Sequence, residues 1–340
     1  MFKNRAMTTV WISALAVGAA VVLGGGAVTE AVAERTAGVE PVGMINRDPG
    51  QIAGPDACAE CHENEHRVWM ESAHEADAKV LSRDPEAKRI AKVLGVRRIK
   101  TDAKCAGCHF TSKENESGKL RSIAGVSCES CHSASATWID PHAQFGADAE
   151  SVEDESAQHR ADRLSYCDSM GMVRPDRLYE LASACYSCHA ITDQDLIHTA
   201  GHPAGSEFEF ASWSQGDLRH NFTRAGADSN PESAMSRQRV MFLVGAAVRL
   251  ESACRAVAVG APAETISGAI DHLRKVDQAV TIDAVSSLIE IGEGVASGGD
   301  AAGAVERIRA IGVRIATERI GDGLGQIDAL IPGAYSGEGR

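Results

Sequence analysis

The sequence predicts a mainly α-helical protein with little β-sheet, which ends in an antiparallel bundle of helices. Apolar residues recur at helical spacing through the last third of the chain. Phe, Trp and Tyr make up only 4% of the 340 residues, so aromatic side chains supply little of the interior. A five-residue motif with two cysteines and one histidine occurs four times before residue 190, and it indicates what fills the interior instead.

The repeated motif is Cys-x-x-Cys-His, and its copies are Cys58–His62, Cys105–His109, Cys128–His132 and Cys185–His189. This spacing is typical of the attachment site of a c-type haem, because two thiols add to the vinyl groups of one porphyrin and the histidine binds its iron. The sequence therefore predicts four covalently attached haem c groups that form the core of this region. The attachment residues would be Cys58, Cys61, Cys105, Cys108, Cys128, Cys131, Cys185 and Cys188, with His62, His109, His132 and His189 as the first iron ligands.

The N-terminus indicates export. Lys3 and Arg5 precede an apolar run over residues 10–28, and Ala31-Val32-Ala33 offers a cleavage pattern, so residues 1–33 are predicted to be a signal peptide. The apolar run is also long enough to remain as an uncleaved membrane anchor. Because c-type haem is attached outside the bacterial cytoplasm, both alternatives predict a periplasmic protein.

Composition divides the rest of the chain into three parts. Residues 34–54 are rich in proline and glycine and predict a linker. Residues 55–230 contain all four motifs and predict a tetrahaem domain. Within them, Asp84-Pro85-Glu86 predicts the start of a helix that stops at Gly95. Residues 231–340 contain no motif and predict a separate helical bundle.

The tail should contain four helices. Apolar residues at helical spacing mark the first over residues 240–250. A second could begin at Pro262, a third covers residues 282–295, and a fourth should begin after an Asp300 cap. Such stripes are more often core than functional surface, so we interpret the tail as a packing or docking element.

The net charge of -13 constrains the partners. An acidic surface argues against nucleic acid and against anionic lipid. It favours a basic redox partner, although acidity that only keeps the protein soluble would look the same.

Two cysteines lie outside the motifs. Cys167 and Cys254 could pair in an oxidising compartment, or each could be a buried thiol that behaves as a small apolar residue.

The second axial ligand of each iron decides between a carrier and a catalyst. A second histidine gives a low-potential electron carrier, whereas an open position binds a small molecule. Three of the remaining histidines are poor candidates: His66 follows His62 too closely, His159 lies in an acidic loop, and His272 is expected on a charged face of the tail. The candidates that remain are His74, His142, His198, His202 and His220, with Met70, Met170 and Met172 as alternatives.

The chain resembles the tetrahaem cytochrome c-554 family of exported bacterial electron carriers over about residues 55–224. The resemblance rests on Trp69 with Ser72-Ala73-His74, on Gly125-Val126-Ser127 before the third motif, and on His142, ten residues after that motif. We know of no comparable likeness for the tail after residue 235.

The resemblance implies a pairing of axial ligands. By position in the family, His142 would cap the first haem, which His62 holds. His74 would cap the third haem, which His132 holds. Each pairing would fold a distant segment of the chain onto a haem.

The other two haems leave an alternative open. In the family, a histidine about thirty residues downstream caps the fourth haem, and His220 matches that position after His189. The second haem, on His109, is five-coordinate in family members. This chain also carries Ala200-Gly201-His202-Pro203, so His202 could cap the second haem or replace His220 at the fourth.

The resemblance implies an electron carrier that connects a donor and an acceptor protein through closely stacked haems. The short stretch between His109 and Cys128 should hold the second and third haems together. Two other functions compete: a reductase of nitric oxide or a related nitrogen species at an open second haem, and a polymerising cytochrome. No Cys-x-x-Cys-Lys motif of pentahaem nitrite reductases is present, so we expect an electron-transfer protein rather than an enzyme, with a reaction of nitric oxide at an open haem as the alternative.

Overall fold

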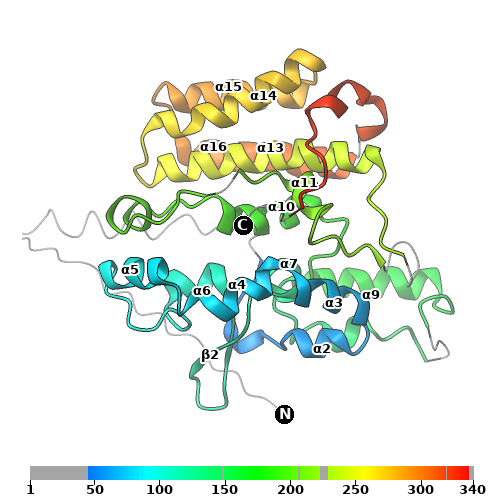
Figure 1. Cartoon of the computed structure of the whole chain (residues 1–340). Coiled ribbons are helices and arrows are strands. Elements are labelled where there is room, and N and C mark those ends of the chain that lie inside the picture. The colour runs from blue at the N-terminus through cyan, green and yellow to red at the C-terminus, as the bar shows by residue number, and fades with distance from the viewer. Residues whose placement is uncertain are drawn as a thin grey trace, which may run out of the picture. The chain divides into compact units, whose positions relative to one another are not determined.

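The computed structural model describes residues 45–147, 149, 151–205, 207–222, 229–318 and 320–336. These residues are mainly helical, with one two-stranded sheet among them (Figure 1), so the predicted fold class is confirmed at that level. The predicted signal peptide and residues 34–44 of the predicted linker lie outside the described residues. None of the described helices has both the length and the apolar composition that a membrane span needs.

Short helices dominate the part of the chain that carries the motifs. They are α2 (Pro55–Ala59), α3 (Glu63–Glu71), α4 (Ala73–Leu81), α5 (Pro85–Val93), α6 (Ala103–His109), α7 (Cys128–His132), α8 (Ile139–His142), α9 (Ala157–Ser169), α10 (Leu178–His189) and α11 (Phe210–Ser214). Single turns lie at Pro49–Gln51 and Asp195–Thr199. The second, third and fourth motifs lie within α6, α7 and α10, each of which ends at the motif histidine. In the first motif only Cys58 and Ala59 lie in α2, and Cys61 and His62 follow before α3 begins.

A hairpin separates the second and third motifs. Strands β1 (Thr111–Glu114) and β2 (Leu120–Ala124) pair antiparallel, with Ser112 opposite Ser122. The amide of Thr111 donates to the carbonyl oxygen of Gly125 at 3.0 Å. The chain therefore returns after the hairpin to a point beside the end of the second motif.

Helix α5 begins and ends as its sequence predicts. The Asp84 carboxylate accepts from the Ala87 amide at 2.7 Å, and Pro85 occupies the first helical position. Gly95 follows the helix with φ of 70°, a conformation that glycine adopts without strain. The same helix carries the exposed basic side chains Lys88, Arg89 and Lys92.

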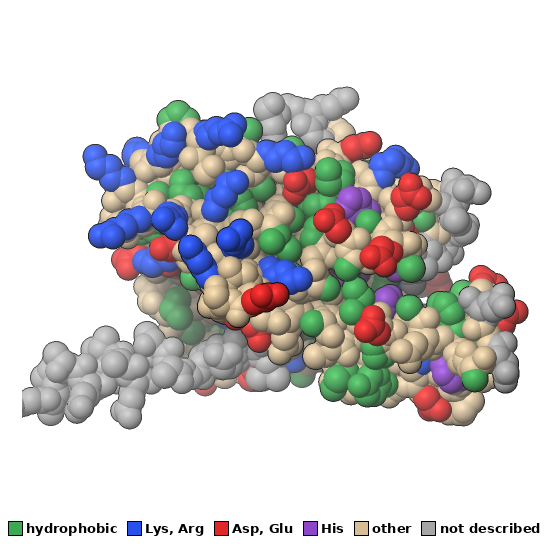
Figure 2. All heavy atoms as spheres, turned by 90° about the horizontal axis from the view of Figure 1, so that it is seen from below, with side chains coloured by type: hydrophobic (Ala, Val, Ile, Leu, Met, Phe, Trp, Pro, Cys, Tyr) green, Lys and Arg blue, Asp and Glu red, His purple; other side chains and the backbone are tan. Residues whose placement is uncertain are grey.

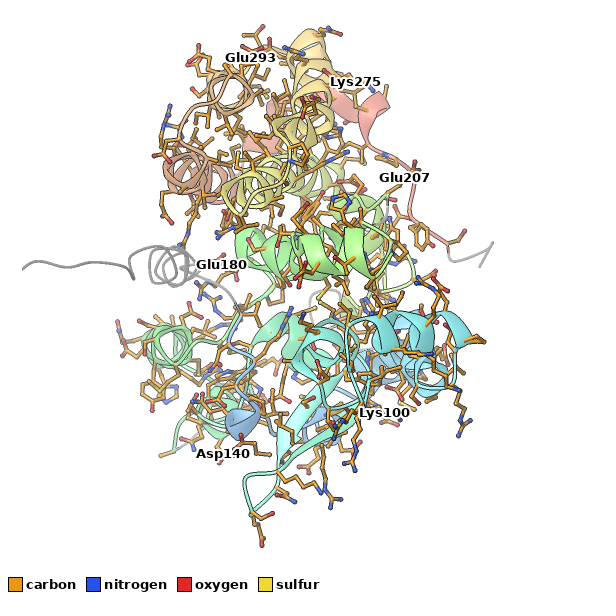
Figure 3. The ribbon with its side chains drawn as sticks, turned by 90° about the vertical axis from the view of Figure 1, so that its left-hand side faces the viewer. Lys100, Asp140, Glu180, Glu207, Lys275 and Glu293 are labelled. Carbon is orange, nitrogen blue, oxygen red and sulfur yellow. The ribbon has the colours of Figure 1, made fainter. Side chains whose placement is uncertain are left out.

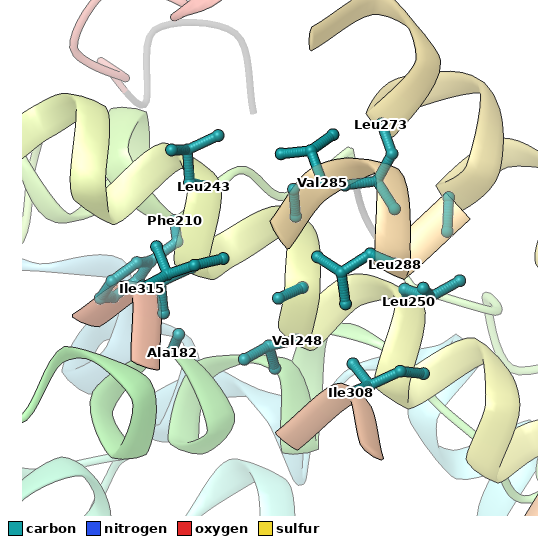
Figure 4. Close-up of a cluster of buried hydrophobic side chains, with 14 of the residues drawn as sticks. Ala182, Phe210, Leu243, Val248, Leu250, Leu273, Val285, Leu288, Ile308 and Ile315 are labelled. Atoms are coloured by element: carbon teal, nitrogen blue, oxygen red, sulfur yellow. The ribbon is translucent and has the colours of Figure 1, made fainter. Parts of the chain in front are cut away.

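The tail has four long helices where the sequence predicts four. They are α13 (Met235–Ala258), α14 (Ser267–Ala279), α15 (Asp283–Ala296) and α16 (Ala301–Glu318). Helix α13 packs against α16, and α14 packs against α15 (Figure 1). Leu250, Leu288 and Ile308 meet in the shared core (Figure 4). The final turns are Ile320–Gly323 and Gly325–Leu330.

Helix α10 joins the fourth motif to this core. Leu178, Tyr179, Ala182 and Tyr186 belong to the same buried cluster as the tail helices. In Figure 3, α10, on which Glu180 is labelled, lies between the tail helices and the motif helices. A Cβ atom at Gly312 would come within 2.6 Å of the Tyr179 ring, so the close approach of α16 to α10 depends on glycine there. The described residues form part of one compact unit, Pro41–Arg340, and the boundary at residue 230 stays a prediction.

Three side chains outside the motifs can now be placed. Cys167 and Cys254 are both buried, and neither forms a disulfide. His272 was expected on a charged face, but its ring packs on Phe242 at 5.0 Å between centroids. Burial, with some help from Arg249 and Lys275, lowers the His272 pKa to about 4. The ring is therefore a neutral packing group, because α14 turns it inward toward α13.

Candidate haem-binding centre

Each motif histidine faces a second histidine from a distant part of the chain. The pairs, with the distances between ring centroids, are His62 and His142 at 6.3 Å, His109 and His202 at 6.2 Å, His132 and His220 at 6.3 Å, and His189 and His74 at 6.3 Å.

This common distance fits a metal between the two rings. An imidazole nitrogen lies about 1.1 Å from its ring centre and a metal–imidazole bond is about 2.0–2.1 Å, so two rings on opposite sides of one metal have centres roughly 6.3 Å apart. The other ring contacts among the described residues have centroid distances from 4.1 to 5.5 Å. The four histidine pairs are therefore too far apart for direct stacking and have the separation that an axial pair requires.

Backbone carbonyls orient several of these rings. The Nδ1 atom of His132 lies 2.8 Å from the carbonyl oxygen of Val173, and that of His202 lies 2.8 Å from the carbonyl oxygen of Pro203. His142 and His220 make the same kind of bond, to Ile139 and Leu218. A carbonyl at Nδ1 fixes the proton there, which leaves Nε2 as the nitrogen that can bind a metal.

Burial favours the neutral form of His132, His109 and His142. It lowers the pKa of His132 to about 4, against a smaller opposing effect of the Val173 hydrogen bond. It also lowers the pKa of His109, to which the nearby His202 ring adds, and the pKa of His142. A neutral imidazole is the form that binds iron, so the protein environment favours ligation.

The cysteines of different motifs touch one another. The Cys128 thiol is near enough to Cys58 to lower the pKa of that thiol, and the Cys188 thiol is near enough to Cys108 to raise the pKa of that one. These thiols occupy the places of the thioether sulfurs that attached haems would have. The contacts connect the first motif with the third and the second with the fourth.

The ligand pairing differs from the family pattern at two positions. His74 faces His189 of the fourth motif rather than His132, and His220 faces His132 rather than His189. The backbone of His74 does dock just before the third motif, since its carbonyl accepts from the Val126 amide at 3.3 Å. Its side chain points away from the third motif and toward His189. The position of His74 in the sequence does not indicate this direction.

The other two pairs concern His142 and His202. His142 faces His62, as the family pattern implies. His202, which could have belonged to the second or the fourth motif, faces His109 of the second.

The remaining candidates lie elsewhere. His198 is exposed, and Met70 and Met170 are also exposed. His66 packs against Trp69, and His159 Nδ1 lies 2.6 Å from the Glu155 carboxylate. None of them belongs to a histidine pair that includes a motif residue.

Arg47 joins the third and fourth motifs and was not singled out in the sequence. Its Nη2 donates to the Ser130 carbonyl at 2.9 Å and to Ser187 Oγ at 3.2 Å, and its Nη1 lies 3.8 Å from Cys188 Sγ. The only signal in the sequence is an arginine in a proline- and glycine-rich segment.

Glu129, inside the third motif, is a second residue that the sequence did not reveal. Its carboxylate is 1% exposed and accepts from the amides of Ala53, Gly54 and Ser135 at 2.8–2.9 Å and from Ser135 Oγ at 2.6 Å. The carboxylate thus anchors the chain before α2 to α7, in line with the rule that buried charges need several donors.

Comparison with known protein families identifies one that matches part of the chain. The family described as cytochrome c554 and c-prime matches residues 57–133, a stretch that contains the first three motifs. The expected family resemblance is thereby confirmed. No curated protein and no solved structure matches the chain.

Proposed function

Because residues 57–133 are a c554-type cytochrome segment, we propose that this electron-transfer protein is a periplasmic tetrahaem carrier between a donor and an acceptor protein. The observation that carries the proposal is the set of four histidine pairs, each with the separation of two axial ligands. Bound haem would supply irons that gain and lose one electron each. The chain's own part is to hold the irons six-coordinate and to shield them.

The pairing of His109 with His202 favours a carrier over a catalyst. A reductase of nitric oxide would need an open position on one iron, and the second motif was the candidate for it. With the ring of His202 at 6.2 Å from that of His109, both sides of this site have a ligand. Catalysis would require His202 to leave.

The origin of the ligands argues against a polymerising cytochrome. In that alternative, a neighbouring molecule would donate a missing axial histidine. All four pairs form within one chain, so no site depends on a second copy.

The sulfur contacts support a route through the protein. Cys58 lies beside Cys128, and Cys108 lies beside Cys188. The third and fourth motifs also approach each other, since the Arg47 guanidinium donates to the Ser130 carbonyl of one and to Ser187 Oγ of the other. We infer the order first, third, fourth, second for electron flow in either direction. This order does not place the second haem beside the third, as the short stretch between their motifs had led us to expect.

The test combines a haem count with electron paramagnetic resonance. The exported chain should carry four covalent haems by mass, and the Cys185→Ala and Cys188→Ala double variant should carry three. All irons of the oxidised protein should be low-spin, and the reduced protein should bind no nitric oxide. A high-spin iron that binds nitric oxide would favour the reductase. Recovery of the protein from the cytoplasmic fraction alone would contradict the proposed location.

A further inference from the structure

The chain is acidic overall but has one strongly basic stretch. Residues 79–121 contain 12 Lys and Arg against five Asp and Glu, a net charge of +7, whereas the other residues contain 22 against 42, a net charge of -20. The stretch covers the end of α4, all of α5 and α6, and most of the hairpin. Positive charge is thus concentrated around the second motif.

Five of these side chains surround one hollow. Its volume is about 690 Å³, and no Asp or Glu lines it. We call the five basic side chains the basic face: Lys88, Lys92, Arg97, Arg98 and Lys100. Figure 2 shows Lys and Arg side chains gathered over this end of the molecule, with Lys100 also labelled in Figure 3.

No described acidic side chain neutralises the charges of the basic face. All five side chains are exposed, and none forms an ion pair with a residue that the structure describes. The Lys100 ammonium lies 5.8 Å from the centre of the Phe110 ring. Among the described residues, no other side chain of the basic face lies over an aromatic ring. Five like charges around one hollow repel each other, and an acidic partner would relieve that repulsion.

Exposed apolar side chains accompany these charges. Val80 is 58% exposed and Val93 is 48% exposed, and Leu120 and Ile123 of the hairpin are also exposed. A few apolar groups among charged ones are typical of small interfaces that form and separate quickly.

The basic face is attached to both ligands of the second motif. Ile99 packs with Ala106 of α6, the helix that ends at His109. On the other side, Arg89 of α5 donates to the Ala200 carbonyl at 2.9 Å, two residues before His202. A protein docked on this face would therefore lie beside the second haem.

We propose that the basic face is the docking surface for an acidic redox protein, which exchanges electrons with the second haem. The inference rests on the proposed function, because it places one of the two partners at the end of the inferred route. The acidic remainder of the surface would serve a partner of opposite charge. The two partners would then not compete for one site.

An acidic protein fits better than a membrane. The rest of the chain has a net charge of -20, which would repel an anionic bilayer at distances within the Debye length. A small protein touches only the basic face and avoids most of that repulsion. Anionic lipid is therefore the alternative that the experiment must exclude.

The experiment measures binding of an acidic flavodoxin to the full haem-loaded protein by calorimetry. The test variant is Lys92→Gln, Arg97→Gln and Arg98→Gln. The control variant, Arg160→Gln, Lys275→Gln and Arg307→Gln, removes the same charge from exposed positions on α9, α14 and α16. At low salt, we expect roughly tenfold weaker binding for the test variant and less than twofold for the control, with both differences shrinking as salt rises.

Several outcomes would overturn the docking proposal. Equal weakening in both variants would mean that only net charge matters, and unchanged binding in the test variant would place the contact elsewhere. Binding to phosphatidylglycerol vesicles that the test variant loses, without binding of flavodoxin, would make the face a membrane contact. Reduction of the haems by a neutral reduced flavin should be equal in all three proteins. Its failure would count against the proposed carrier function, independently of the binding result.

Discussion

The guanidinium of Arg47 donates to the Ser130 carbonyl, inside the third motif, at 2.9 Å. The same side chain reaches Ala184 and Ser187 on the helix of the fourth motif. One half-buried cation thus holds the helices of two motifs together, and it comes from a segment that precedes all four motifs.

Replacing Arg47 should change redox potential as well as stability. Arg47→Gln removes a positive charge beside two haems, so we expect the potentials of the third and fourth haems to fall by roughly 40 mV, which corresponds to about 1 kcal/mol for one electron. Arg47→Lys keeps the charge but loses the forked hydrogen bonds. A spectroelectrochemical titration should therefore show potentials near the wild type for Lys and lower ones for Gln. Equal potentials in all three proteins would remove the electrostatic role.

Removing the His202 ring should open the second haem. In His202→Ala, we expect one of four irons to become high-spin and to bind nitric oxide or carbon monoxide when reduced. His198→Ala is the matched control, since His198 is an exposed histidine in the preceding turn and should leave all irons low-spin. Electron paramagnetic resonance of both oxidised variants makes the comparison. A low-spin spectrum of His202→Ala would mean that another residue holds the second position.

The buried carboxylate of Glu129 should be costly to alter. Glu129→Gln replaces an acceptor oxygen by an amide that faces backbone donors, so we expect the free energy of unfolding to fall by roughly 1–3 kcal/mol. Glu60 occupies the corresponding region of the first motif but is exposed, and Glu60→Gln should change stability by less than about 0.5 kcal/mol. Thermal unfolding of the haem-loaded variants measures both. Similar losses in the two would refute the anchoring role of Glu129.

Protonation of His272 should destabilise the tail in acid. Its folded pKa of about 4 lies below the ordinary value of 6.5, so the unfolded chain binds a proton in this range that the folded chain does not. Stability is therefore present above pH 6.5 and is lost as the pH falls toward 4. One pKa unit is about 1.4 kcal/mol; with the ring partly exposed, we expect a loss of roughly 1–2 kcal/mol.

The variant His272→Gln isolates this effect. Urea unfolding of both proteins at several pH values gives the difference in their unfolding free energies. The variant should gain relative to the wild type as the pH falls. A difference that stays constant with pH would show that other groups cause the acid sensitivity.

Local features were predictable from the sequence. Helix α5 has its cap and its first-position proline at one end and its terminal glycine at the other. Each of these residues determines the backbone only at its own end of the helix, so both ends can be predicted from the local sequence. The tail helices follow from apolar spacing for the same reason. The motifs fix their own cysteines and histidines because the chemistry is contained in five residues.

The partners of His74 and His220 were not predictable from the sequence, because they depend on tertiary docking. His74 and His189 meet although 115 positions separate them in the sequence. The direction of the His74 ring depends on how α4 packs against the loop before α7. No local sequence pattern predicts that packing. Arg47 was missed for a related reason: it bonds mostly to backbone carbonyls, which any sequence offers.

The position of α10 has a consequence for how this protein could have been inherited. The family match ends at residue 133, before the helix that carries the fourth motif. That helix lays Leu178 and Tyr179 into a core otherwise built mostly by the tail. A recombination point near residue 230 would cut this core and leave both fragments with exposed apolar surface. We therefore expect the fourth motif and the tail to be inherited together, because recombination between them would disrupt their shared core.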